Sequence, residues 1–432
     1  MEPRTKWLVP KKSSCSCTMS GVWRAVSFCK GCAVIFHSPS GCMHVASTMD
    51  TGSYYRSVAD LHPEYIDMVP LVSSNIRERD SIFGGISRLH GCISYIMETY
   101  KPECIFIASS CVAGVIGDDI DAEAEGAEME YGIPVIPINY AGFLGGEYGD
   151  GYYKTAQVII DRFLKPCPKN EKSVLLLGDQ MGPWGQYAQE ITRLVSGLGF
   201  TVKWQFPGYV PFKRWKDIAG AAYSVLLGNA GSGNDRLSDM AKVMEDRFGI
   251  KTLGPIFPTG WENTKQWIAA FSELTGVEEK GLVLLEAEEK RLTSYVKQIS
   301  HVTKGKRAVI GIGRSPRWYD PKDTVEMVLR MQMELPAVVV YDNLTDDEIQ
   351  WMTERIRRVS SVRIMTSREA KGVIEEADLL LTTNQMVNIG VKQFFVPMVP
   401  MAGTGGEIAM MRTMYRLLCR YGNKGGIAYA KV

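Results

Sequence analysis

Short apolar runs alternate along this chain with longer stretches in which apolar and polar positions follow a helical period. The apolar runs have the length of buried strands, and the amphipathic stretches have the length of helices. A repeated strand–helix–strand order favours right-handed parallel α/β units. The apolar runs lie at residues 103–109, 133–138, 173–178, 201–205, 224–228, 307–313, 336–341 and 377–383, and the helical stretches at 86–100, 118–131, 186–198 and 235–248.

This order predicts an α/β fold of three Rossmann-like domains with mainly parallel sheets, spanning residues 15–165, 170–285 and 303–425. A charged stretch with two prolines, residues 165–172, predicts the first linker. A long polar-periodic stretch, residues 277–301, predicts a helix that connects the second and third domains. Because ligands of open α/β sheets bind at the carboxyl ends of the strands, we expect the functional residues in the loops found there.

Charge and hydropathy limit the classes of protein to which this chain can belong. The chain has 432 residues, with 49 Lys and Arg against 48 Asp and Glu. This balance predicts neither nucleic acid nor an anionic membrane as a partner. No long uncharged apolar stretch indicates a transmembrane helix, and residues 1–14 lack the apolar core of a secretory signal. We therefore expect a cytoplasmic protein.

Cysteine is distributed unevenly. Of ten cysteines, eight lie within the first 111 residues. In a reducing compartment, clustered thiols more often serve metal binding or redox chemistry than disulfides. These eight are Cys15, Cys17, Cys29, Cys32, Cys42, Cys92, Cys104 and Cys111.

Three of these cysteines stand in loop contexts. Cys111 closes the loop after the predicted strand 103–109, and Cys42 lies in a Pro/Gly turn after an apolar run. Cys17 lies in a segment of small residues. Asp118 and Asp119 are expected to begin the helix that follows Cys111. For each cysteine taken alone, the alternative is a small buried side chain.

The other thiols and the histidines are less specific. The Cys29–Cys32 pair has no second pair for a zinc ribbon and no histidine after it for haem attachment, so redox, ligand and core roles stay open. His37 and His44 flank Cys42, either to hydrogen-bond a cluster or as ordinary loop residues. No P-loop lysine motif occurs, so this chain is not expected to hydrolyse nucleotide. We expect core positions for Cys92, Cys104, Cys167 and Cys419.

The contexts of the three loop cysteines resemble one known family. They are Ser-Cys-Thr-Met-Ser-Gly, His-Ser-Pro-Ser-Gly-Cys and Ser-Ser-Cys-Val-Ala-Gly-Val-Ile-Gly-Asp-Asp, joined by Ile-Phe-Gly-Gly at 82–85 and by the segment 134–143. This set resembles the component-1 (nitrogenase α/β-like) superfamily, which includes nitrogenases, the cofactor-assembly scaffold, protochlorophyllide reductase and methylthio-alkane reductase. The likeness is specific over residues 15–160 and mainly architectural from 170 to 425.

The resemblance implies a shared iron–sulfur cluster. In that family, three cysteines of each subunit hold half of a cluster at the α–β interface, and the matching residues here are Cys17, Cys42 and Cys111. Soft thiolates suit such a cluster, a [8Fe-7S] P-cluster-like group or alternatively a [4Fe-4S] cluster. The implied partners are a homologous α-type subunit, in an α2β2 heterotetramer, and an ATP-hydrolysing iron protein. Phe83 resembles the surface on which that iron protein docks.

One departure from the family bears on the role of this chain. Catalytic α-type subunits bind their active-site cofactor through a Cys in the second domain and a His in the third. Here no Cys occurs between 168 and 418, and no His after 301. The resemblance therefore implies a β-type subunit of a nitrogenase-like reductase, which carries no catalytic residue of its own and works only with its partners. Reductive C–S cleavage of methylthio-alkanes is the candidate reaction.

The alternatives are the β-type subunit of a cofactor-assembly scaffold, of a protochlorophyllide-type reductase, or of a nitrogenase proper.

Overall fold

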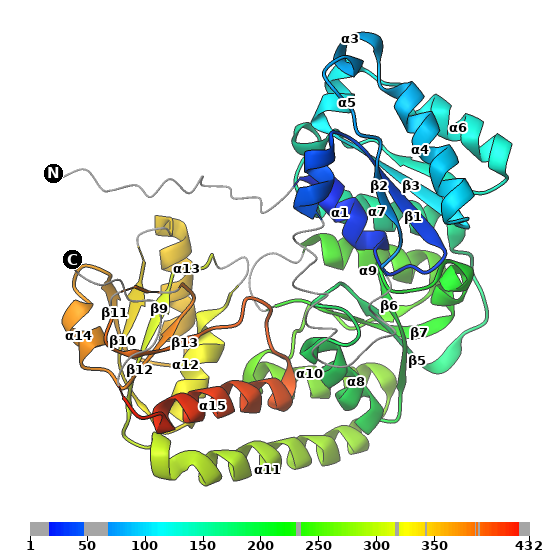
Figure 1. Ribbon diagram of the computed structural model, residues 1–432. Coiled ribbons are helices and arrows are strands. Elements are labelled where there is room, and N and C mark those ends of the chain that lie inside the picture. The colour runs from blue at the N-terminus through cyan, green and yellow to red at the C-terminus, as the bar shows by residue number, and fades with distance from the viewer. Residues whose placement is uncertain are drawn as a thin grey trace, which may run out of the picture.

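The computed structural model describes residues 17–46, 68–229, 235–315, 319–341, 344–384, 386–387 and 389–422. Within these residues the strands form three sheets, and neighbouring strands are parallel throughout. Helices cover the sheets (Figure 1). The predicted class, α/β with three Rossmann-like sheets, is confirmed. The residue limits predicted for the domains stay a prediction.

The first sheet has the strand order β2-β1-β3-β4. Its strands are β1 (Cys32–His37), β2 (Leu71–Ser73), β3 (Cys104–Ser109) and β4 (Val135–Ile138). Its helices are α1 (Thr18–Val26), α3 (Asp80–Phe83), α4 (Ile86–Thr99), α5 (Cys111–Ile116), α6 (Ile120–Tyr131), the 3-10 turn η2 (Gly142–Leu144) and α7 (Tyr148–Phe163). Alternate residues of β1 face opposite cores: Ile35 packs with α4 and α6, and Phe36 with α1 and α7.

Helices α1 and α7 touch through two glycines. A Cβ at Gly21 would lie 1.9 Å from the carbonyl oxygen of Tyr148, and a Cβ at Gly151 would lie 1.9 Å from that of Thr18. Only glycine allows so close an approach of two backbones. This contact fixes the start of α1, where Cys17 lies, against the start of α7.

The second sheet has the order β6-β5-β7-β8 and shares a hydrophobic core with the first. Its strands are β5 (Asn170–Leu177), β6 (Thr201–Phe206), β7 (Ala221–Leu226) and β8 (Lys251–Thr252). Its helices are α8 (Gln186–Gly197), the 3-10 segment η3 (Phe212–Gly220), α9 (Asp235–Phe248) and α10 (Gly260–Thr275). Strand β5 begins inside the predicted linker, because Asn170 pairs in register with Ala221. The neighbouring Lys169 ammonium also donates to the carbonyl of Ala221, at 2.8 Å.

The third sheet has the order β11-β10-β9-β12-β13 and a core of its own. Its strands are β9 (Arg307–Ile312), β10 (Glu334–Val340), β11 (Arg363–Thr366), β12 (Leu379–Thr382) and β13 (Lys392–Phe395). Its helices are α12 (Pro321–Arg330), α13 (Asp346–Arg357), α14 (Lys371–Glu375) and α15 (Gly403–Cys419).

The predicted connecting helix is confirmed as α11 (Glu278–Thr303), which runs from the second sheet to the third along the base of the molecule, with α15 beside it (Figure 1). Helix α15 begins back at the second sheet. Its first residues bind buried acids there, since the Gly405 N–H donates to Glu190 at 2.7 Å. Among the described helices, none is both long enough and apolar enough to cross a membrane.

Candidate metal centre

The three cysteines singled out from the sequence lie on three different elements of the first domain. Cys17 precedes α1 and pairs with Glu147, just before α7, in an isolated β-bridge. Cys42 lies in the helical residues 40–46 that follow β1. Cys111 is the first residue of α5, directly after β3. Strands β1 and β3 are neighbours and end in register, so the segments that carry Cys42 and Cys111 leave the same edge of the sheet.

The three thiols are half-buried, and none of them forms a disulfide within the described residues. Burial raises the pKa of Cys42, and the nearby Cys17 and Cys111 raise it further. Within the described residues, no three His, Cys, Asp or Glu side chains converge on a point where a single metal ion would bind. The thiols are thus close enough to influence one another without surrounding one ion. Thiolates that bind separate irons of one cluster need no such convergence.

The surroundings of Cys111 fit a thiolate ligand. The backbone N–H of Phe143 donates to the Cys111 sulfur at 3.1 Å, and such bonds tune the potential of iron–sulfur clusters. Gly142 has φ +51°, and a Cβ there would lie 2.6 Å from the same sulfur. The Thr18 hydroxyl, next to Cys17, donates to the Gly142 carbonyl at 3.1 Å. The turn at η2 therefore ties the positions of Cys17 and Cys111 together and leaves room at the sulfur.

The Cys29–Cys32 pair lies in the core. Both side chains are buried, and Cys32 faces Cys104 across neighbouring strands. Burial raises the pKa of Cys29 to about 12, and it also raises the pKa of Cys32. Buried protonated thiols are poor nucleophiles and poor ligands, so a structural role fits this pair best.

The remaining thiols follow the predictions in part. Cys92 and Cys104 are buried, as expected. Cys167 is half-buried and its thiol donates to the Lys216 carbonyl at 3.7 Å. The core prediction for Cys419 is wrong, because this residue is exposed at the end of α15. Cys15 lies outside the described residues.

The contacts of two polar residues bear on their expected roles. Both ring nitrogens of His37 are occupied, by Ser74 and Asp118 at 2.9 Å each, which favours the second of its two alternatives, an ordinary hydrogen-bonded side chain. Asp118 does not begin the next helix. Gly117 ends α5 with φ +78°, and Asp119 alone caps α6 by accepting from the Ala122 N–H at 3.1 Å.

Exposed apolar side chains lie on the elements that carry or adjoin Cys111. Phe83 is 85% exposed on α3, and Val115 is 78% exposed on α5. Helix α5 contacts both α3 and η2, so these side chains belong to one region. The resemblance singled out Phe83. The apolar pattern gave no sign of the others, because helices of one or two turns are too short to show a periodicity that reveals exposure. The others are Ile82, Val112, Phe143 and Leu144.

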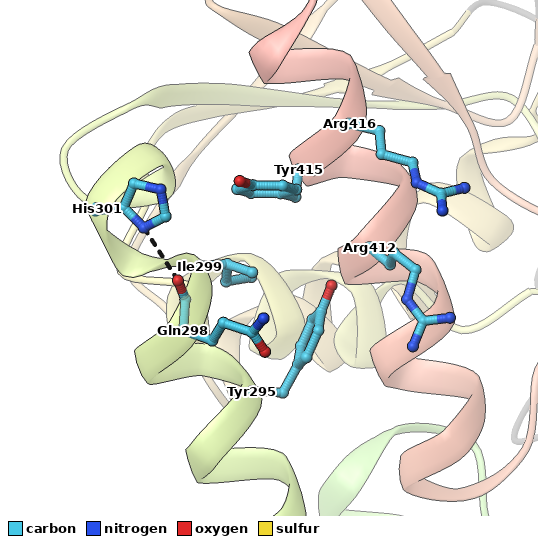
Figure 2. A pocket seen from close by; sticks show the side chains of 7 residues that line it. All are labelled: Tyr295, Gln298, Ile299, His301, Arg412, Tyr415 and Arg416. Atoms are coloured by element: carbon cyan, nitrogen blue, oxygen red, sulfur yellow. Dashed lines mark hydrogen bonds between the residues drawn. The ribbon is translucent and has the colours of Figure 1, made fainter.

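A separate cavity of about 410 Å³ lies between α11 and α15. Figure 2 shows the Tyr415 ring and Ile299 in the middle of this cavity. His301 lies on one side, and Arg412 and Arg416 lie on the other. The His301 ring bonds the Gln298 carbonyl at 3.0 Å. No cysteine lines this cavity, which lies on the opposite side of the molecule from α1 and α5 (Figure 1).

Comparison with known proteins agrees with this fold. The model of the family "Nitrogenase component 1 type Oxidoreductase" matches residues 17–416. The nitrogenase iron-molybdenum cofactor biosynthesis protein NifE of Clostridium pasteurianum is 30% identical over 65% of this chain and 58% of its own length. The nitrogenase molybdenum-iron protein alpha chain of Methanothermobacter marburgensis is 23% identical over 88% of this chain and 82% of its own.

Among solved structures, "Nitrogenase Cp1 at pH 5" has the same fold, with a TM-score of 0.64 and 17% identity over 94% of this chain and 88% of that one. The family match starts at Cys17 and includes all three sheets. This chain therefore belongs to the nitrogenase component 1 type oxidoreductases.

Proposed function

We propose that this chain is the β-type subunit of a nitrogenase-like reductase complex and holds half of an interface iron–sulfur cluster through Cys17, Cys42 and Cys111. The complex passes electrons from an ATP-hydrolysing iron protein to a catalytic metallocofactor in the α-type partner. The observation that carries the proposal is the grouping of these three half-buried thiols at one end of the first domain.

The donor set fits such a cluster. Thiolates are the ligands that iron–sulfur clusters take, and the N–H···S bond from Phe143 supports a charged sulfur at Cys111. When bound, the cluster supplies one-electron storage and transfer. A [8Fe-7S] cluster is the first candidate and a [4Fe-4S] cluster the second.

The exposed apolar residues around Cys111 support two contacts with partners. Val115 on α5 and Leu144 on η2, which is 68% exposed, are suited to a homologous α-type subunit that supplies the remaining ligands in an α2β2 heterotetramer. Phe83 on α3 is suited to the iron protein, a transient partner. Large apolar side chains exposed together are typical of interaction sites.

The β-type assignment rests on the ligands that the chain lacks. It has no Cys between 168 and 418 and no His after 301, so it offers neither of the side chains with which α-type subunits bind their cofactor. Some of its relatives are themselves alpha chains. However, overall sequence similarity reflects the fold that all these subunits share. Whether a subunit can bind the cofactor depends on the side chains that it carries.

The test is to purify the chain anaerobically with its homologous partner and to measure iron per αβ pair together with the EPR spectrum. About eight interface irons indicate the larger cluster and about four the smaller one. Cys42→Ala and Cys111→Ala are expected to remove this cluster, whereas the control Cys92→Ala, a buried core thiol, keeps it. Full iron in Cys42→Ala or Cys111→Ala contradicts the ligand assignment.

The reaction is tested on the same complex. Reduction of a volatile methylthio-alkane that depends on both ATP and the iron protein supports the reductase, with C–S cleavage as its reaction. A complex that carries the cluster but leaves the thioether unchanged contradicts that substrate.

A second function, a subunit of a cofactor-assembly scaffold, is favoured by the likeness to NifE. A scaffold would release a metallocofactor to an acceptor protein and would reduce no substrate. Transfer of activity to a cofactor-free acceptor therefore separates it from the reductase.

A further inference from the structure

The imidazole of His37 is enclosed between two hydrogen-bonding partners. The ring is fully buried, with Nδ1 2.9 Å from the Ser74 hydroxyl and Nε2 2.9 Å from Asp118 Oδ2. The Ser74 oxygen accepts from the Ser38 N–H at 3.1 Å, so its own proton is available for Nδ1. Nε2–H then donates to the carboxylate. Burial lowers the pKa of His37, in agreement with this neutral ring.

The other carboxylate oxygen of Asp118 binds the turn that follows α3. Oδ1 accepts from the Gly85 N–H at 2.8 Å. A Cβ at Gly85 would lie 2.6 Å from Asp118 Oδ2 and 3.1 Å from the His37 ring. The backbone of this turn is therefore packed directly against both side chains.

These contacts join three segments that lie far apart in the sequence. His37 ends β1, which leads into the segment of Cys42. Asp118 follows the end of α5, which begins at Cys111. Gly85 follows α3, where Phe83 and Ile82 are 85% and 78% exposed. One buried pair thus connects the exposed aromatic ring to both thiol-bearing segments.

Helix α3 depends on such contacts. It has four residues, and a single helical turn does not form stably by itself. At its start, the Asp80 carboxylate accepts from the Arg77 N–H at 2.7 Å and from the Arg88 guanidinium. Just after its end, the Asp118 carboxylate accepts from the Gly85 N–H. Losing Asp118 therefore frees one end of the segment that presents Phe83.

We propose that His37 and Asp118 are positioning residues that set where Phe83 stands relative to Cys42 and Cys111, and so where the iron protein docks. This inference rests on the proposed function, because it takes the iron protein as the partner of Phe83. Both side chains are buried, so the pair is not itself a docking surface. It acts by holding Gly85, and hence α3, in one position.

The experiment measures the Kd of the iron protein for the intact αβ complex by isothermal titration calorimetry. Asp118→Ala is expected to raise the Kd about tenfold, because the Gly85 and His37 bonds are both lost. Asp118→Asn keeps an acceptor for Gly85 and recovers most of the affinity. Its amide can donate to His37 Nε2 once the ring takes the other tautomer, in which Nδ1–H donates to the Ser74 oxygen. Iron content is expected to be the same in all variants.

A double-mutant cycle with Phe83 separates positioning from general stability. If Asp118 acts through Phe83, then Phe83→Ala with Asp118→Ala binds no worse than Phe83→Ala alone. Additive losses, or an unchanged Kd in Asp118→Ala while Phe83→Ala weakens binding, overturn the positioning role alone. An unchanged Kd in Phe83→Ala overturns the docking site as well, and a complex without interface iron overturns the proposed function.

Discussion

Gly142→Ala tests the packing around the proposed ligand Cys111 without removing a thiol. A Cβ at Gly142 would lie 2.6 Å from the Cys111 sulfur and 2.8 Å from the Cys111 backbone nitrogen. Real Cβ atoms do not approach other atoms so closely. The sulfur can rotate away but the backbone nitrogen cannot, so the start of α5 must shift.

The matched control is Gly132→Ala at the end of α6. Gly132 has φ +68°, similar to the φ of +51° at Gly142, but a Cβ there meets no atom within 4 Å. Both substitutions carry the cost of a left-handed alanine, about 1–2 kcal/mol. Only Gly142→Ala adds overpacking, roughly 1–3 kcal/mol more.

The assay has two parts. Urea unfolding of the full chain is expected to show a lower free energy of unfolding for Gly142→Ala than for Gly132→Ala, by roughly 1–3 kcal/mol. In the αβ complex, interface iron is expected to fall in Gly142→Ala and to stay at the wild-type level in Gly132→Ala. Equal stability and equal iron in the two variants would refute the reasoning.

Three further predictions concern other parts of the molecule. Asp179→Asn removes the carboxylate that pairs with the buried Arg24 at 2.7 Å, between the first and second sheets. In a denaturant titration, this substitution is expected to lower the free energy of unfolding by roughly 3–5 kcal/mol. Burial raises the pKa of Glu407 from 4.5 to about 7, so its contribution to stability is present below pH 4.5 and is lost as the pH rises through 7. Glu407→Gln should therefore flatten the pH dependence of unfolding between pH 5 and 8, by up to about 3 kcal/mol, and an unchanged slope would contradict this origin. Iodoacetamide at pH 8 should label the exposed Cys419 in the native chain and spare Cys29, as peptide mass spectrometry can check.

Much of the fold could be predicted because it is encoded locally. Strands of parallel sheets are buried on both faces and read as continuous apolar runs, as in β3, which begins one residue after the predicted start. The polar period of α11 likewise placed its ends within two residues. The three-residue strand β2 has too short a pattern to be read this way. The return of α15 to the second sheet depends on contacts such as that of Gly405 with Glu190, which lie 215 positions apart.

The candidate site, like the fold, could be predicted from the sequence only in part. The sequence by itself determined the number and type of thiols, their loop contexts and the lack of further Cys and His ligands in the later domains. It left open whether Cys29 and Cys32 are ligands, redox thiols or core residues, because burial depends on what packs against each segment.

Tertiary structure alone decided what surrounds the proposed ligands. The Thr18 hydroxyl meets the Gly142 carbonyl across 124 positions, and His37 meets Asp118 across 81. The physical reason is that periodicity and turn chemistry act over a few residues, whereas hydrogen-bond partners and buried contacts arise only when distant segments fold against each other.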